Sequence, residues 1–304
     1  MQGLDYIATD GAQAFDDLNK IVESLISSGD VDSKWRKDIE QKLKMARRYL
    51  KIDYKCHLSV ADACSDHCMT FALNDEMNPE FASKCDHEHN MKCERCNALT
   101  EVLENIEHEI RGSNHFEETK IRMEYEFQKC ASDIKEWKAH LLRTVNQEMG
   151  QQEALNQLKD DGALLVMDWA MKYMPQKYHE KMTDFFGKRG VNWHVSAVIT
   201  KKENSDDFVN CYVHIFQSCT QNWFAVASLI ENLLMNIKKT DSVSRVFFRS
   251  DNAGCYHNAA LILSLPEIGR RVGIEICRYD FSDAQAGKDI CGDRPNESSH
   301  KAVG

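Results

Sequence analysis

The sequence predicts an α+β protein whose first half is helical and whose second half contains a mixed β-sheet. Up to about residue 160, apolar residues recur at helical spacings of three and four, whereas from Gly162 onward short apolar runs alternate with helical segments. A dense Cys/His segment interrupts the helical half. We therefore expect a helical region at 1–55, a Cys/His module at 56–111, a helical hairpin or coiled coil at 112–160 and a sheet domain at 161–304.

Composition indicates a soluble globular chain. It has 304 residues, of which 42% are hydrophobic and 28% charged. No run approaches about 18 uncharged apolar residues, so we expect no membrane span. The N-terminal sequence lacks the basic and apolar regions of a secretory signal, so we expect an intracellular protein. Residues 1–161 hold 21 Lys and Arg against 32 Asp and Glu, which excludes a simple basic DNA-binding arm.

Three stretches of the first half have helical periodicity. Two of them flank the sequence Ser27-Ser28-Gly29-Asp30, which predicts a break between two packed amphipathic helices. The third runs from 116 to 158 with one apolar stripe: Ile134, Trp137, Leu141, Val145 and Met149. Such a stripe is typical of helix packing or of a dimer interface, so we expect that 116–158 could join two copies of the chain.

Ten of the 24 Cys and His residues fall within residues 56–96. Without a secretory signal, this density favours reduced thiols and metal ligation over disulfides. Cys93 and Cys96 form a CxxC knuckle that opens a helix. With Cys85 and His87 they would give a Cys₃His zinc site, in which His89 could replace His87.

A second set of potential ligands precedes this one along the chain. Its members are Cys56, His57, Cys64, His67 and Cys68. They form either a second metal site or a group of unrelated thiols. A short segment with such ligands and few apolar residues would owe its order largely to metal.

In the second half, seven segments alternate in type. Five read as strands, at 163–170, 193–201, 208–216, 244–249 and 272–279, and two as helices, at 223–237 and 253–265. The order is βββαβαβ. Three strands in hairpin-like succession followed by βα units predict a mixed five-stranded sheet with helices on its faces.

Two carboxylates on this predicted sheet require an explanation. Asp168 lies inside the apolar run LLVMDWAM, where an ionised side chain is costly without a partner. Asp251 follows the fourth strand, where an isolated Asp commonly caps a turn or helix. If the first and fourth strands are neighbours, the two carboxylates converge, and a divalent metal relieves their repulsion.

Four ordered blocks then resemble a known family: LLVMDWAMKYMP, FFGKRGVNWHVSAV, FFRSDNAGCYHNA and RYDFSDAQAGKDICGDR. Across about residues 160–294 the chain resembles the ribonuclease H-like fold of integrases and DDE/DDD transposases, particularly transposase-derived proteins of animal genomes. The resemblance implies metal-dependent DNA cleavage and strand transfer with Mg²⁺ or Mn²⁺ at Asp168 and Asp251, DNA as the partner, and a nuclear location.

The family mechanism needs a third acid after the fifth strand. The block AGKDICGDR favours Asp293, but Gly292 departs from the family pattern and leaves Asp289 as the alternative. Lys288 is the expected phosphate contact, whereas Asp280 and Asp283 are expected to serve the turn.

The chain ends at Gly304, where the family usually continues into a supporting helix, so we expect a truncated and weakly active or inactive copy. The alternative is a non-enzymatic, zinc-containing nuclear scaffold that binds DNA or protein and derives from a transposase.

Overall fold

Four long helices build the first of the two units into which the chain divides. They are α1 (Tyr6–Ser27), α2 (Ser33–Arg48), α5 (Glu94–Gly112) and α6 (Glu117–Gln157). In this computed structural model the first unit comprises residues 1–146 and the second 147–304. The described residues are 5–79, 82–174, 178–179, 181, 190–201, 208–240 and 243–282. Among them, no helix is long and apolar enough to cross a membrane.

Local sequence signals set the ends of the first two helices. The carboxylate of Asp5 accepts from the backbone N–H of Ala8 at the start of α1, and that of Asp32 accepts from Trp35 at 2.7 Å at the start of α2. Gly29 has a φ of 79°, which a residue without Cβ adopts readily. The predicted break between two helices is therefore confirmed.

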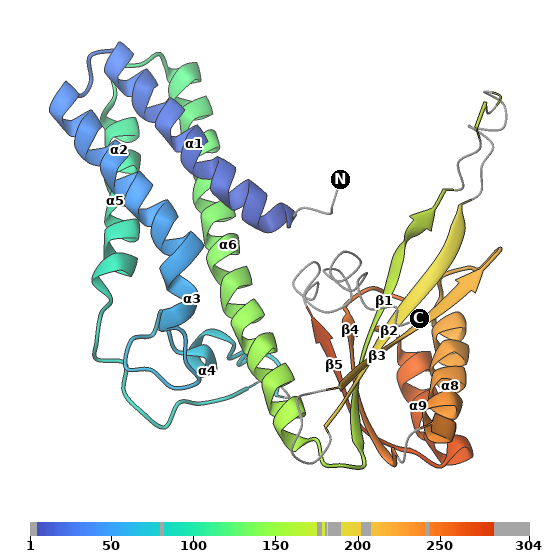
Figure 1. The fold of residues 1–304 in the computed structure, drawn as a ribbon. Coiled ribbons are helices and arrows are strands. Elements are labelled where there is room, and N and C mark those ends of the chain that lie inside the picture. The colour runs from blue at the N-terminus through green and yellow to red at the C-terminus, as the bar shows by residue number, and fades with distance from the viewer. Residues whose placement is uncertain are drawn as a thin grey trace, which may run out of the picture. The chain divides into compact units, whose positions relative to one another are not determined.

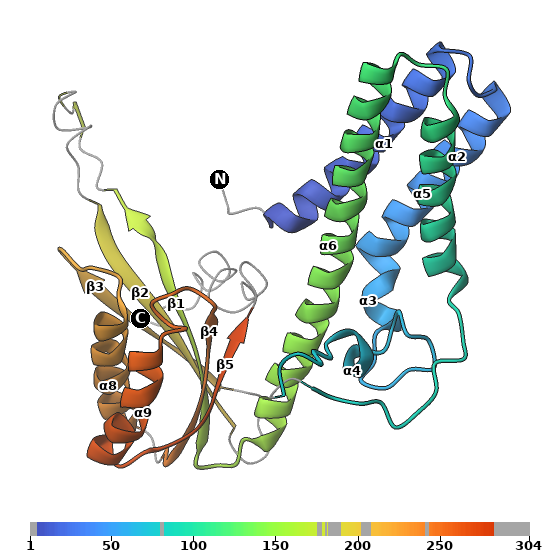
Figure 2. The same cartoon turned by 180° about the vertical axis from the view of Figure 1, so that it is seen from behind.

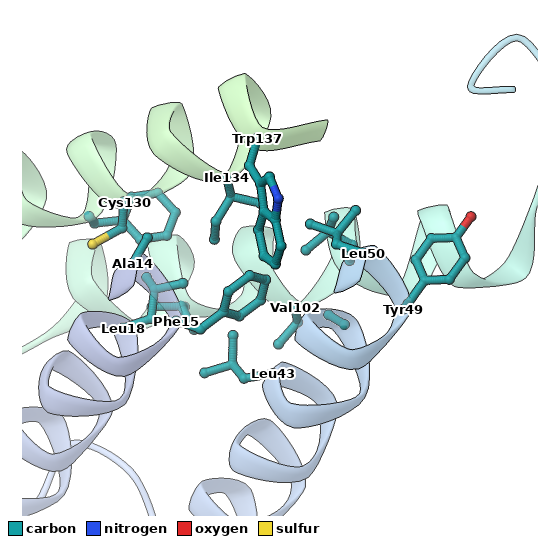
Figure 3. Packing of buried hydrophobic residues seen from close by; sticks show 14 of the residues in the cluster. Ala14, Phe15, Leu18, Leu43, Tyr49, Leu50, Val102, Cys130, Ile134 and Trp137 are labelled. Carbon is teal, nitrogen blue, oxygen red and sulfur yellow. The ribbon is translucent and has the colours of Figure 1, made fainter. Parts of the chain in front are cut away.

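The helices pack around a continuous apolar core. Figure 3 shows Trp137 projecting from α6 toward Phe15 of α1, and their ring centroids lie 6.4 Å apart with an edge-to-face orientation. A Cβ atom on Gly11 would lie 2.5 Å from Cβ of Trp137, so only glycine allows this approach. Ile134, Trp137 and Leu141 are all buried here, so this part of the stripe predicted on 116–158 packs within its own chain, whereas Met149 is exposed.

Between α2 and α5 the chain has little regular structure. A five-residue π-helix, η1 (Tyr49–Asp53), is followed by two single turns, α3 (Tyr54–His57) and α4 (Met69–Ala72). Two isolated β-bridges, Ser59 with Cys68 and Cys64 with Met91, join the loops. Most of the Cys and His residues discussed above lie in this segment.

Five strands form a mixed sheet in the second unit. They are β1 (Gly162–Tyr173), β2 (Val191–Thr200), β3 (Phe208–Phe216), β4 (Arg245–Asp251) and β5 (Glu275–Ser282). The spatial order is β3-β2-β1-β4-β5, in which β1 to β3 are antiparallel and β1, β4 and β5 are parallel. The α+β class and the mixed five-stranded sheet expected from the sequence are confirmed.

Two helices, α8 (Trp223–Thr240) and α9 (Ala259–Val272), cover one face of this sheet (Figures 1 and 2). The prediction that the second of them stops before Pro266 is wrong, because α9 continues to Val272. Proline removes one backbone donor, but Leu265, Ile268 and Val272 continue the buried stripe across it. The opposite face carries a smaller cluster that includes Leu164, Val166 and Phe247.

Candidate functional site

Four donor side chains converge in the first unit. Cys68, Cys85, His87 and His89, which we call the inner group, have ligand atoms within 4.8 Å of one another and could hold a metal ion such as zinc. Cys68 Sγ lies 3.7 Å from Cys85 Sγ and 3.5 Å from Nε2 of His87. Tetrahedral zinc with bonds of about 2.3 Å to sulfur and 2.0–2.1 Å to nitrogen requires edges of about 3.8 and 3.6 Å. The inner group therefore fits zinc.

The surroundings of the ligand side chains in the inner group also resemble those of a zinc site. The Asp86 carboxylate lies 3.1 Å from Nδ1 of His87, so Nε2 is the ring nitrogen that would bind a metal, in place of its present contact with the carbonyl oxygen of Asp62 at 3.1 Å. Nε2 of His89 is buried and has no hydrogen-bond partner among the described residues. A buried ring nitrogen without a partner is costly, and a metal bond would remove that cost.

The Cys68 thiol is poised to lose its proton. Burial opposes ionisation, but hydrogen bonds from His89 and from the backbone N–H groups of this loop outweigh it and lower the pKa of Cys68 to about 6. Burial and the neighbouring Cys68 sulfur raise the pKa of Cys85. The thiolate is the form that binds metal, and of the two thiols in this group Cys68 ionises at the lower pH.

The sequence-based grouping of these ligands needs correction. We expected Cys85 and His87 to share one zinc with Cys93 and Cys96, but the structure places the last two elsewhere. Cys93 lies with His57 and His67, with donor atoms within 4.8 Å, and Cys96 Sγ is 3.6 Å from Nε2 of His67. The reason is tertiary. Cys93 and Cys96 are fixed at the start of α5, whereas His87 and Met91 contact the loop after α3, at Asp62 and Ala63.

Three residues that our proposed zinc set omitted thus belong to candidate metal groups: His57, His67 and Cys68. The sequence does contain a signal for them, because they form part of the second set of potential ligands. It gives no indication that the neighbours His67 and Cys68 belong to different groups. That division requires knowing which loops meet.

Two acidic residues occupy equivalent positions on adjacent strands of the second unit, Asp168 within β1 and Asp251 at the end of β4. In the parallel register of β1 with β4, Met167 lies opposite Ser250, and Asp168 and Asp251 are the next residues on each strand. Side chains at equal register in parallel neighbours point to the same face. That face is the one on which Val166 and Phe247 pack together. The expectation that Asp168 and Asp251 lie on neighbouring strands is therefore confirmed.

The surroundings of this acidic pair disfavour charge. Burial raises the pKa of Asp251, although the backbone N–H of Ala253 donates to its carboxylate at 3.2 Å and opposes the rise. The Tyr256 hydroxyl is fully buried and has no hydrogen-bond partner among the described residues. Burial raises the pKa of Tyr256 most, and the nearby charges of Asp168 and Asp251 raise it further. A cation beside Asp251 would favour its ionised form.

The remaining predicted residues are placed only in part. Asp289, Asp293, Lys288 and Asp283 lie outside the described residues. Asp280 was expected in the turn after the fifth strand, but it lies within β5, where its carboxylate accepts from Nε of Arg278 at 2.7 Å. Asp280 therefore already has an ion-pair partner, which it shares with Glu153.

Comparison with known proteins gives one result. Residues 147–293 match a family described as "Domain of unknown function (DUF8701)", and this range falls within the second unit and covers just under half of the chain. No curated protein and no solved structure matches the chain. The sheet with its acidic pair is thus similar to a family whose own function is undefined.

Proposed function

We propose that the second unit is a ribonuclease H-like domain of transposase type that cleaves DNA with Mg²⁺ or Mn²⁺. The strand order β3-β2-β1-β4-β5, with three antiparallel strands followed by two parallel ones, supports this fold. The four sequence blocks that resemble transposase-derived proteins lie almost wholly within the matched range. The same resemblance supports DNA as the partner and the nucleus as the place of action.

The observation that carries the proposal is the placement of Asp168 beside Asp251. Adjacent parallel strands fix both residues at one level and on one face of a buried sheet. A sheet is a rigid scaffold, so the separation of the carboxylates does not depend on a mobile loop. Structural roles rarely require two acids in such a position, whereas binding divalent cations does.

The chemistry follows from this arrangement. Asp168 and Asp251 would hold Mg²⁺ or Mn²⁺, which when bound activates an attacking oxygen and neutralises charge on the scissile phosphate. The protein's own part is to fix the two carboxylates and to orient the phosphate. The third carboxylate is expected from Asp293 or Asp289, and the phosphate contact from Lys288.

A nicking assay tests the proposal. The full chain is incubated with supercoiled plasmid and Mg²⁺ or Mn²⁺, beside Asp168→Asn, Asp251→Asn and the exposed control Asp160→Asn. We expect weak cleavage by the parent and control chains and a loss of at least about 100-fold in both sheet variants. Asp289→Ala and Asp293→Ala, tested separately, identify the third acid. Cleavage that survives Asp168→Asn and Asp251→Asn, or no cleavage with either ion, contradicts the proposal.

One observation favours the non-enzymatic scaffold instead. Asp251 accepts from the backbone N–H of Ala253, a local turn contact that stabilises the loop without any metal. In that case the chain would bind DNA or protein through its zinc-containing first unit. A gel-shift measurement distinguishes the two functions. If the chain is a scaffold, DNA binding should be unchanged in Asp168→Asn/Asp251→Asn and should be lost when zinc is chelated.

A further inference from the structure

A second set of donors lies in the first unit, apart from the inner group. His57, His67, Cys93 and Cys96 form what we call the outer group, because its members flank the inner group along the sequence. We propose that the outer group binds a second zinc ion. The segment from Tyr49 to Cys96 would then be a two-zinc module in which the ligands of one centre flank those of the other along the chain.

The Tyr49 hydroxyl shows that the four donors face one point. Its oxygen lies 3.1 Å from Nε2 of His67 and 3.3 Å from Sγ of Cys96. It also lies 3.4 Å from Nδ1 of His57 and 3.6 Å from Sγ of Cys93. The four donors therefore gather around one oxygen atom. The donor atoms of His57, His67 and Cys93 lie within 4.8 Å of one another, and Cys96 joins them through its contact with His67.

The chemistry of this donor set suits zinc. Two sulfurs and two imidazole nitrogens make a Cys₂His₂ set, which is a common structural zinc combination. Soft sulfur ligands argue against Mg²⁺ or Ca²⁺, which prefer oxygen. Cys96 is 2% exposed and His67 is 7% exposed, so water contributes little to satisfying their polar atoms.

The protein holds the outer group from several directions. Cys93 precedes the first turn of α5 and Cys96 lies within it, while His57 ends α3. Tyr49 is the first residue of η1, a π-helix, and such helices are frequent at functional sites. The Arg95 guanidinium lies 5.7 Å from the centre of the Tyr49 ring. Helix ends therefore hold three of the four donors: His57, Cys93 and Cys96.

The two groups nevertheless share one piece of chain. His67 belongs to the outer group and Cys68, the next residue, belongs to the inner group. The backbone N–H of Ser59 donates to the carbonyl of His67, and the N–H of Met69 donates to the carbonyl of Ser59. Filling one centre therefore fixes the backbone that carries a ligand of the other, so binding of the two ions should be cooperative.

Metal analysis of the purified full chain tests the proposal. We expect two equivalents of zinc in the parent protein and about one in Cys93→Ser/Cys96→Ser. His67→Ala should lose one equivalent, whereas His67→Cys, which keeps a ligand, should retain two. Cys56→Ser is the matched control, since this exposed thiol lies beside His57 but belongs to neither group, and it should retain two.

Two results would overturn the second centre. One is a parent protein with a single equivalent or none, and the other is two equivalents that persist in Cys93→Ser/Cys96→Ser. If that variant does not fold, titrating the metal-depleted parent chain with Co²⁺ gives the answer. Absorption from sulfur–cobalt bonds that grows up to two equivalents supports the proposal, and growth that ends at one contradicts it.

Discussion

The Cys/His segment and the sheet position their candidate ligands in opposite ways. In the sheet, backbone pairing between β1 and β4 sets Asp168 beside Asp251 whether or not an ion is present. In the segment, two single helical turns and two isolated bridges are the main regular structure around eight donors. The sheet can therefore form without any metal, whereas the segment would depend on bound zinc for much of its order.

The largest expected effect is the loss of order in the segment on zinc removal. Metal binding contributes on the order of 10 kcal/mol to the folding of small zinc modules. Hydrogen exchange on the full chain with and without a strong chelator should therefore show lost protection at the amides of Ser59 and Met91, which donate to His67 and Ala63. The amides of β1 should keep theirs. Equal loss of protection in both regions would contradict the proposed difference between the segment and the sheet.

A mutation in the helical core should destabilise the first unit without touching a donor. A methyl group on Gly11 would collide with Trp137, so Gly11→Ala should cost about 1–3 kcal/mol of unfolding free energy. Gly112→Ala is the control, because no atom lies within 4 Å of its added Cβ. Chemical denaturation measures both. If Gly11→Ala left the free energy of unfolding unchanged, metal binding rather than the helical core would determine the stability of this unit.

The second unit should show its own acid sensitivity. Burial, and then the charge of His214, lower the pKa of His194 from 6.5 to about 3. Between pH 6.5 and about 3, His194 is therefore protonated in the unfolded chain and neutral in the folded one. The neutral His194 contributes fully to the free energy of unfolding above pH 6.5. Below that pH its contribution falls by about 1.4 kcal/mol per pH unit.

Melting temperatures between pH 7 and 4.5 test this for the parent chain and His194→Phe. The advantage of the parent should shrink as pH falls, because the phenyl ring has no proton to gain. Exposed His108→Phe serves as the control. Parallel curves for the parent and His194→Phe would show that His194 does not cause the sensitivity.

The smallest effect concerns the acidic pair itself. Because burial raises the pKa of Asp251, its ionised form weakens the fold at pH 7 in the absence of divalent cations. Asp251→Asn keeps an oxygen to accept from Ala253 and should raise the melting temperature slightly in chelator. Added Mn²⁺ should stabilise the parent chain and leave the variant unchanged. An equal change in melting temperature for both chains would mean that Asp251 does not bind the metal.

Regular structure was largely predictable from sequence because it depends on local patterns. The helical stripes, the break at Gly29 and the βββαβαβ order all follow from the spacing of apolar residues and from turn chemistry. Pro266 misled the prediction, since burial of Ile268 and Val272 outweighs one missing backbone donor. The position of Asp168 within a strand likewise required only the run of apolar residues around it.

The sequence by itself determined which residues could bind metal: a dense set of Cys and His before α5, and two acids at the first and fourth strands. Only the tertiary structure decided their partners. It separated Cys85 from Cys93 and placed His67 and Cys68 in different groups. The physical reason is that a strand's register constrains its neighbours over many residues, whereas ligands on loops meet only where long-range contacts bring those loops together.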